Sequence, residues 1–193
     1  MHKAIWFAAV MALSAPAYAQ TAAPAAPACN TLDSPAGKAW ARANAWRYAD
    51  PARAAAVYRD LADSRNPSPW PDGIAPQWTV LPTGTRFQMA IAKGQIQPDG
   101  TIWYGGFGTF DRIDSTQQVR DWLAVRSDFK GSVDFVLTLE VVQPLPALVG
   151  PIGPQVEPAG CKLLPGGGMQ LQMVTLPKDR AAYLKVIEQR PVQ

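Results

Sequence analysis

Apolar side chains recur at every second position between Val133 and Val142, and this alternation constrains the fold more than any other feature of the chain. A period of two predicts a strand that turns one face to the core. Apolar odd positions alternate with partly polar even ones: Val133, Phe135, Leu137, Leu139 and Val141, against Asp134, Thr138 and Glu140. Pro144 and Pro146 follow and break the strand. The chain is therefore expected to contain a sheet.

Further strands are expected to be short, because 15 glycines and 19 prolines in 193 residues favour many turns. Alternating or β-rich patterns predict strands over residues 86–91, 101–104, 106–110 and 169–176. Residues 150–168 are rich in glycine and proline and are expected to form loops.

Helices are predicted mainly at the two ends of the chain. Asp33-Ser34-Pro35 and Asp50-Pro51 each combine a capping residue with a proline, which is typical of a helix start. Ser115-Thr116-Gln117-Gln118 is a capping-box pattern and predicts a further helix. Pro177 to Gln189 reads as a final helix whose inward residues are Ala182, Tyr183, Val186 and Ile187. The fold class is therefore expected to be α+β, with a small antiparallel β-sheet core, an N-terminal helical extension and a C-terminal helix.

The first residues indicate export. A short basic start, an apolar run from Ala4 to Leu13 and the sequence Ala17-Tyr18-Ala19 are typical of a secretory signal peptide cleaved before Gln20. The alternative, a retained membrane anchor, needs a longer apolar run. We therefore expect a secreted or periplasmic protein with no membrane attachment after cleavage. The expected organisation is a signal peptide (1–19), an Ala/Pro-rich linker (20–32), a helical extension (33–77) and an α+β domain (78–193).

Histidine chemistry is excluded from the mature chain, because His2 is the only histidine and lies in the signal peptide. We therefore expect no Ser-His-Asp or Cys-His catalytic site in the mature chain, and no metal site, because most zinc sites use histidine. Lys and Arg exceed Asp and Glu by only three, without a dense basic run, so nucleic-acid binding is not expected either.

Cys29 and Cys161 are the only cysteines. In an exported chain an even count favours a disulfide, here between the N-terminal arm and the loop before the last predicted strand. A reactive thiol is the alternative, although no histidine or CxxC partner would lower its pKa.

Candidate site residues occur at several places in the 78–193 region. The glycines of Pro165-Gly166-Gly167-Gly168-Met169-Gln170 either let backbone N–H groups approach a phosphate or form a tight loop. The alternating segment from Tyr104 to Phe110 either stacks a planar ring or forms a bulged strand. Arg120 either clamps a phosphate or is simply solvated or paired with an acid such as Asp121, and Glu140 is either a base or part of a solvated strand face.

Three segments in one order give the 78–190 region a resemblance to the tuberculosis necrotizing toxin family, whose domains are NAD glycohydrolases. Leu81-Pro82-Thr83-Gly84-Thr85 resembles the start of the family's first strand. Gly106-Phe107-Gly108-Thr109, with Val119-Arg120 after it, resembles the Gly-x-Phe-x-Ser segment and its following arginine. The stretch from Glu140-Val141 through Gly150-Pro151-Ile152 to Gly166-Gly167-Gly168-Met169-Gln170 is similar to the Gly-Gly-Gly-x-Gln ending.

This resemblance implies an exported enzyme that releases nicotinamide and ADP-ribose from NAD or NADP as substrate and needs no cofactor. It implies Gln170 as the catalytic-site glutamine, with Arg120 holding the substrate phosphate. It further implies a substrate site formed by Phe107, Thr109, Arg86, Gly167 and Gly168. Where the family's first strand usually carries Asp-Arg before a glycine, this chain has Gln88-Met89 and Arg86 is displaced. The same resemblance implies an antagonistic toxin with an immunity protein as partner.

Two other functions stay open at this level. One is a non-catalytic envelope protein that binds a nucleotide or a protein on the same scaffold, suggested by the altered first motif. The other is ADP-ribosyl transfer to a protein, which would need a positioned acid such as Glu140.

Overall fold

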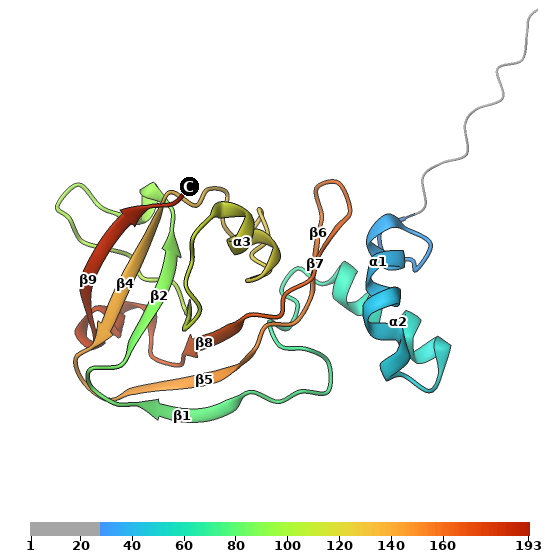
Figure 1. Ribbon diagram of the computed structural model, residues 1–193, viewed down its shortest axis with the longest axis horizontal. Coiled ribbons are helices and arrows are strands. Elements are labelled where there is room, and N and C mark those ends of the chain that lie inside the picture. The colour runs from blue at the N-terminus through green and yellow to red at the C-terminus, as the bar shows by residue number, and fades with distance from the viewer. Residues whose placement is uncertain (1–27) are drawn as a thin grey trace, which may run out of the picture.

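The structure is a computed structural model that describes residues 28–193 (Figure 1). The expected signal peptide and residues 20–27 of the expected linker lie outside this range. Seven strands form one antiparallel sheet in the order β1-β5-β8-β3-β2-β4-β9. Their bounds are β1 Gln77–Leu81, β2 Arg86–Ile91, β3 Phe107–Thr109, β4 Phe135–Val141, β5 Leu145–Pro151, β8 Met169–Met173 and β9 Leu184–Pro191. The expected α+β class is confirmed, with a larger sheet than the small core that the sequence predicts.

The sheet bends sharply, so that β1, β5 and β8 run across the molecule while β2, β4 and β9 rise steeply from them (Figure 1). The bend encloses the main hydrophobic core, which takes alternate residues from six of the seven strands. Its fully buried members are Ile91, Leu137, Leu139, Val141, Leu145, Ala147 and Leu171. The predicted alternation along β4 is therefore confirmed, because its odd positions face this core.

The predicted C-terminal helix is wrong. Pro177–Tyr183 is a 3-10 helix, and the chain then enters β9, which pairs with the whole of β4 from Phe135↔Pro191 to Val141↔Leu184. The apolar positions fit helical spacing, but without β9 the backbone groups along one side of β4 would lack partners. Pairing across the sheet therefore overrides the local pattern.

The loop regions also differ from expectation. Residues 101–104 contribute only an isolated bridge between Ile96 and Ile102. The region expected to be loops holds the end of β5 and a separate hairpin of β6 (Gln155–Glu157) and β7 (Lys162–Leu164). Pro146 lies inside β5 and still contributes through its carbonyl, which accepts a hydrogen bond from the backbone N–H of Val174.

Two helices form the N-terminal extension, as predicted: α1 (Pro35–Asn44) and α2 (Pro51–Asp63). Ser34 caps α1 by accepting from the N–H of Gly37, and Asp50 caps α2 by accepting from the N–H of Ala52. Both helices pack on the β6–β7 hairpin rather than on the large sheet, through a core that includes Trp40, Tyr58 and Val156 (Figure 1). Among residues 28–193, no helix has the length and apolar character needed to cross a membrane.

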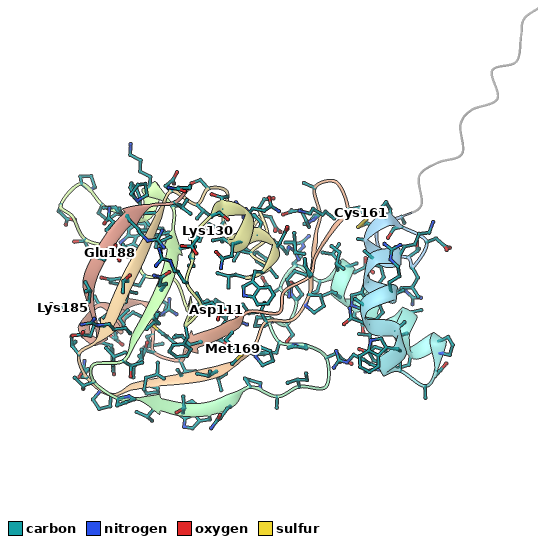
Figure 2. All side chains as sticks on the ribbon, in the orientation of Figure 1. Asp111, Lys130, Cys161, Met169, Lys185 and Glu188 are labelled. Carbon is teal, nitrogen blue, oxygen red and sulfur yellow. A yellow bond between two sulfur atoms is a disulfide. The ribbon has the colours of Figure 1, made fainter. Side chains whose placement is uncertain are left out.

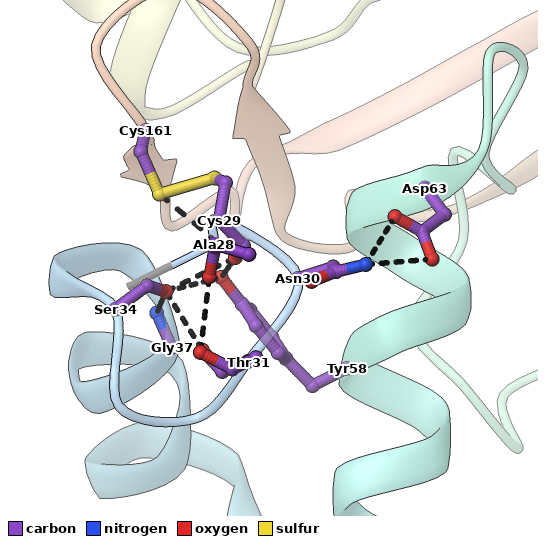
Figure 3. Close-up of a disulfide and its surroundings, with 9 residues drawn as sticks. All are labelled: Ala28, Cys29, Asn30, Thr31, Ser34, Gly37, Tyr58, Asp63 and Cys161. Atoms are coloured by element: carbon purple, nitrogen blue, oxygen red, sulfur yellow. Dashed lines mark hydrogen bonds between the residues drawn. A yellow bond between two sulfur atoms is a disulfide. The ribbon is translucent and has the colours of Figure 1, made fainter. Parts of the chain in front are cut away.

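A disulfide joins Cys29 to Cys161, as the cysteine count predicts (Figure 3). It fastens the start of the helical extension to the β6–β7 turn, across a sequence separation of 132 residues. The carbonyl of Cys29 accepts hydrogen bonds from Tyr58 Oη at 2.7 Å and Ser34 Oγ at 3.0 Å, so the arm is held from both sides.

Removing this disulfide is expected to lower the free energy of unfolding by about 2–4 kcal/mol, because the long closed loop restricts the unfolded chain. Thermal unfolding of the oxidised protein and of the double variant Cys29→Ala/Cys161→Ala measures the difference. A reducing agent should lower the midpoint of the wild type and leave that of the double variant unchanged. Equal midpoints for the oxidised wild type and the double variant would contradict a stabilising role.

Candidate functional site

A cleft of about 690 Å³ opens on the face of the sheet opposite to the main core, with β2, β3 and β8 contributing to it. The loop between α3 (Thr116–Asp121) and β4 forms one wall, and residues 66–69, which follow α2, form part of another. Its volume is in the range of pockets that hold a small molecule or cofactor. Of the side chains in this region, Figure 2 labels Asp111, Lys130 and Met169.

Strand register places a row of polar side chains on the floor of this cleft. Gln88 of β2 pairs with Thr109 of β3, which in turn pairs with Gln170 of β8. Directly opposed residues in neighbouring strands turn their side chains to the same face. The structure therefore brings together Thr109 and Gln170, two residues that come from different motifs of the family resemblance, and adds Gln88 to them.

Gln170 is held in one orientation. The residue is only 7% exposed, and Nε2 donates to the carbonyl oxygen of Pro69 at 3.0 Å. A carbonyl can only accept, so the amide oxygen Oε1 is the end that remains available, and no residue in the described part of the chain donates to it. Thr109, by contrast, uses its hydroxyl within the fold, donating to the carbonyl of Met169 and accepting from the N–H of Asp111.

Two phenylalanines give the cleft exposed aromatic surface. Phe107 on β3 is 45% exposed and Phe129 in the loop after α3 is 51% exposed, and both belong to the lining. The guanidinium of the buried Arg126 lies over the Phe129 ring, 4.5 Å from its centroid. Exposed ring faces of this kind can stack on a planar heterocycle.

Lys130 is the only charged side chain among the described residues that line the cleft. It is half-buried, and its ammonium donates to the side-chain oxygen of Gln95. Burial lowers the pKa of Lys130 from its ordinary value, the nearby Arg120 lowers it further, and Asp134 partly offsets both. The cleft therefore offers one cation, without a carboxylate in its described lining, to an anionic ligand.

Arg120 and Arg86 lie outside the lining. Arg120 donates to the carbonyls of Val125 and Gly131 at 3.0 and 3.2 Å, so it braces the loop that carries Phe129 and Lys130. Arg86 is paired with Glu140 at 2.8 Å at the far end of β2. The guanidinium of Arg120 thus binds backbone carbonyls, and the carboxylate of Glu140 forms an ion pair with Arg86.

In the glycine turn before β8 (Gly166, Gly167 and Gly168), the backbone N–H groups form hydrogen bonds within the fold. The N–H groups of Gly166, Gly167 and Gly168 donate to the carbonyls of Asp121, Ile152 and Trp122 at 2.9, 3.0 and 3.2 Å, respectively. Neither Gly167 nor Gly168 lines the cleft. This arrangement favours the tight-loop interpretation, because the turn docks the start of β8 on the end of α3 and leaves none of these three donors for a phosphate.

Asp111 strengthens the same junction, since its Oδ2 accepts from the indole N–H of Trp122 at 3.0 Å and from the N–H of Met169 at 2.8 Å. These contacts fix the residue that precedes Gln170. The cleft floor is therefore positioned by a network that joins β3, α3 and β8.

Sequence reasoning missed Lys130, Phe129 and Gln155. The run Phe129-Lys130-Gly131, between the helix predicted to start at Ser115 and the strand predicted to start at Val133, was the one available signal, since an aromatic, a cation and a glycine adjoin there. Gln155 carried no signal, yet it is 4% exposed and lines the cleft, and its Oε1 lacks a partner among the described residues. Within residues 28–193, no group of three His, Cys, Asp or Glu side chains is arranged to hold a metal ion.

The chain matches no protein-family model and no curated protein sequence. Among solved structures, Tne2 in complex with Tni2 is similar at 28% identity and a TM-score of 0.55, over 64% of this chain and 97% of that one. Rhs1-CT, in complex with the cognate immunity protein RhsI1, aligns at 16% identity and a TM-score of 0.42, over 61% and 80% of the two chains. Tse6, in complex with Tsi6, aligns at 15% identity and a TM-score of 0.38, over 78% and 93%.

Proposed function

We propose that the cleft binds NAD or NADP and hydrolyses the bond between nicotinamide and ribose, releasing nicotinamide together with ADP-ribose from NAD or ADP-ribose 2′-phosphate from NADP. The observation that carries this proposal is the convergence of an oriented amide (Gln170), an exposed aromatic face (Phe107) and a cation (Lys130) in one cleft. The motif resemblance over residues 78–190 and the similarity of the fold to Tne2 support it.

The cleft suits a dinucleotide in charge and in surface. NAD carries two phosphates, which Lys130 would attract, and planar rings at both ends, which Phe107 and Phe129 would stack. In this assignment Lys130 takes the phosphate-binding role that the resemblance implies for Arg120. Arg120 then stabilises the α3–β4 loop that carries Lys130, through its hydrogen bonds to the carbonyls of Val125 and Gly131.

The reaction fits a cleft whose described lining contains no carboxylate. When the bond from ribose C1′ to the nicotinamide nitrogen breaks, its electron pair goes to the ring, which leaves neutral and needs no acid. The oxocarbenium-like sugar then reacts with water, which forms the new bond to C1′ and loses a proton to solvent. The Oε1 of Gln170 would accept a hydrogen bond from that water and orient it.

The proposal extends to an exported toxin that acts against other cells and is bound by an immunity protein. The secretory pattern in residues 1–19 and the Cys29–Cys161 disulfide support export. The complex of the similar protein Tne2 with a second protein, Tni2, supports a protein partner.

A non-catalytic nucleotide-binding protein is the second candidate. It is favoured by the internal use of Arg120 and of the N–H groups of Gly166, Gly167 and Gly168. ADP-ribosyl transfer through Glu140 finds no such support, because that carboxylate is bonded to Arg86 and lies outside the cleft lining.

Release of nicotinamide from NAD and from NADP by the purified, oxidised protein tests the proposal. Turnover is expected to yield nicotinamide and an equal amount of free ADP-ribose from NAD, or of free ADP-ribose 2′-phosphate from NADP. Micromolar binding of NAD or ADP-ribose without turnover would favour the second candidate. Labelled ADP-ribose found on an added protein instead of in solution would indicate transfer.

Replacing Lys130 with methionine is expected to raise the KM for NAD about tenfold or more, because the diphosphate loses its cation. The protonated amine binds the phosphates, so wild-type affinity should fall as pH rises through the lowered pKa of Lys130, below the range of an ordinary lysine. Lys130→Arg should keep affinity up to higher pH. Steady-state kinetics against pH measure both effects.

Lys185→Met is the matched control, since Lys185 is an exposed lysine on β9 outside the cleft lining (Figure 2). An unchanged KM for Lys130→Met, or equal changes in both variants, would contradict the phosphate-binding role of Lys130.

A further inference from the structure

Residues 66–69 form a short strap that leaves α2 and crosses to the large sheet before β1. The strap belongs to the N-terminal segment, yet Asn66, Pro67 and Pro69 line the cleft together with the polar row of the sheet. A second cavity of about 700 Å³ lies against the strap, lined by Pro67, Ser68 and residues of both helices. The strap therefore separates two cavities and is one of the walls of the cleft.

Buried donors hold the strap on both sides. Gln155 Nε2 donates to the carbonyl of Ser68 at 2.8 Å, and the N–H of Gly153 donates to the carbonyl of Pro69 at 2.9 Å. At the end of α2, just before the strap, Nη1 of the buried Arg126 donates to the carbonyl of Ser64 at 3.2 Å. These donors belong to the β5–β6 connection, to the first residue of β6 and to the α3–β4 connection, so the strap and the end of α2 before it are fastened to the rest of the fold.

Pro69 links the strap to the chemistry of the cleft. Its carbonyl accepts from two donors, the backbone N–H of Gly153 and the side-chain amide of Gln170. The backbone bond fixes where the carbonyl lies, and the carbonyl then decides which end of the Gln170 amide faces it. Only the amino end can donate, so Oε1 is kept toward the cleft.

We propose that the strap is a wall of the substrate site and that the Pro69 carbonyl is a positioning group for Gln170. This inference rests on the proposed NAD hydrolysis. It makes the helical extension part of the catalytic unit, because α1 and α2 carry the strap and are themselves held by the Cys29–Cys161 disulfide and by packing on Val156. The domain boundary near residue 78 that the sequence suggests would then divide the active site.

Gly153 offers a way to displace the strap without touching the cleft. It does not line the cleft, and a Cβ added there would lie 2.7 Å from the backbone nitrogen of Pro71 and from the carbonyl carbon of Trp70. Gly153→Ala therefore has to displace Trp70 and Pro71, which directly follow the strap, and so lengthen the hydrogen bond from the N–H of residue 153 to the carbonyl of Pro69. Gly94→Ala is the matched control, because a Cβ at Gly94 meets nothing within 4 Å.

The test is a double-mutant cycle on nicotinamide release. Gly153→Ala is expected to lower kcat about tenfold or more in the wild type, because the Gln170 amide loses its fixed orientation. The same change should lower kcat much less in a Gln170→Ala background, where no amide is left to orient. Hydrogen exchange of residues 64–72 should rise in Gly153→Ala and stay unchanged in Gly94→Ala.

A kcat for Gly153→Ala equal to that of the wild type would overturn the inference, as would equal losses in the two backgrounds. If Gly153→Ala fails to fold, Gln155→Leu removes the bond to Ser68 and enters the same cycle. A folded wild type without turnover refutes the proposed function and the positioning role with it. An active wild type that is insensitive to the strap refutes the positioning role alone.

Discussion

Replacing Gln170 with alanine is expected to lower nicotinamide release by about 100- to 1,000-fold while the protein stays folded. Removal of one oriented hydrogen-bonding group at a reacting centre typically has an effect of this size. Gln170 lines the cleft, and the one side-chain hydrogen bond that it makes within residues 28–193 is the one to the carbonyl of Pro69. Steady-state kinetics with NAD, together with thermal unfolding of the same preparation, separate loss of catalysis from loss of structure.

Gln172→Ala is the matched control for this prediction. Gln172 lies on the same strand and the same face two residues later, opposite Phe107, and does not line the cleft. It should retain most of the wild-type activity. Full activity of Gln170→Ala would remove Gln170 from the catalytic site, and equal losses in both variants would indicate a general disturbance of β8.

Replacing Gly166 with alanine is expected to lower the free energy of unfolding by about 3 kcal/mol or more. Two independent causes add here. The backbone has φ +69, which L side chains rarely adopt, and a Cβ would lie 2.6 Å from the carbonyl oxygen of Gly153 and 2.7 Å from that of Ile152. Both obstacles are backbone atoms of the β5–β6 connection, so a rotamer change cannot relieve them.

Chemical denaturation of Gly166→Ala measures this loss, with Gly94→Ala as the control that should stay within about 1 kcal/mol of the wild type. Activity should fall as well, because the turn fixes the start of β8 and with it the place of Gln170. A Gly166→Ala protein as stable as the wild type would mean that the turn adapts, and that its role in docking β8 on α3 is small.

Local sequence signals predicted the elements that depend on local physics. The caps at Ser34 and Asp50 form as predicted, because a capping oxygen needs only the N–H groups of the next turn. At Ser115 the side chain also accepts from the N–H of Gln118, whereas the side chain of Gln118 turns to Asp114 instead of completing the capping box. The alternation of apolar residues was sufficient to predict β4, the longest of the predicted strands.

The last part of the chain shows where local signals fail. Ala182, Tyr183, Val186 and Ile187 fit a helical face, and nothing nearby in the sequence excludes a helix. The outcome is a strand because β4, more than forty residues earlier, offers an open edge along its length. That contact is visible only after the sheet has assembled.

The candidate site divides in the same way. The family motifs pointed to Phe107, Thr109 and Gln170, and strand register places these three on one face of neighbouring strands. The same motifs pointed to Arg120, Arg86 and two glycines, whose polar groups the fold uses elsewhere. A motif names a residue, whereas the availability of its donors depends on what the completed fold places beside them.

The sequence by itself determined the α+β class and the pairing of Cys29 with Cys161, because the period of the apolar residues and the cysteine count suffice for these. Only the tertiary structure decided the position of Lys130 in the cleft, the β9 strand and the contact of Pro69 with Gln170. Pro69 and Gln170 are separated by 101 positions in the chain. Such contacts arise when the helical extension docks on the β6–β7 hairpin and brings the strap to the sheet, and no local pattern encodes that docking.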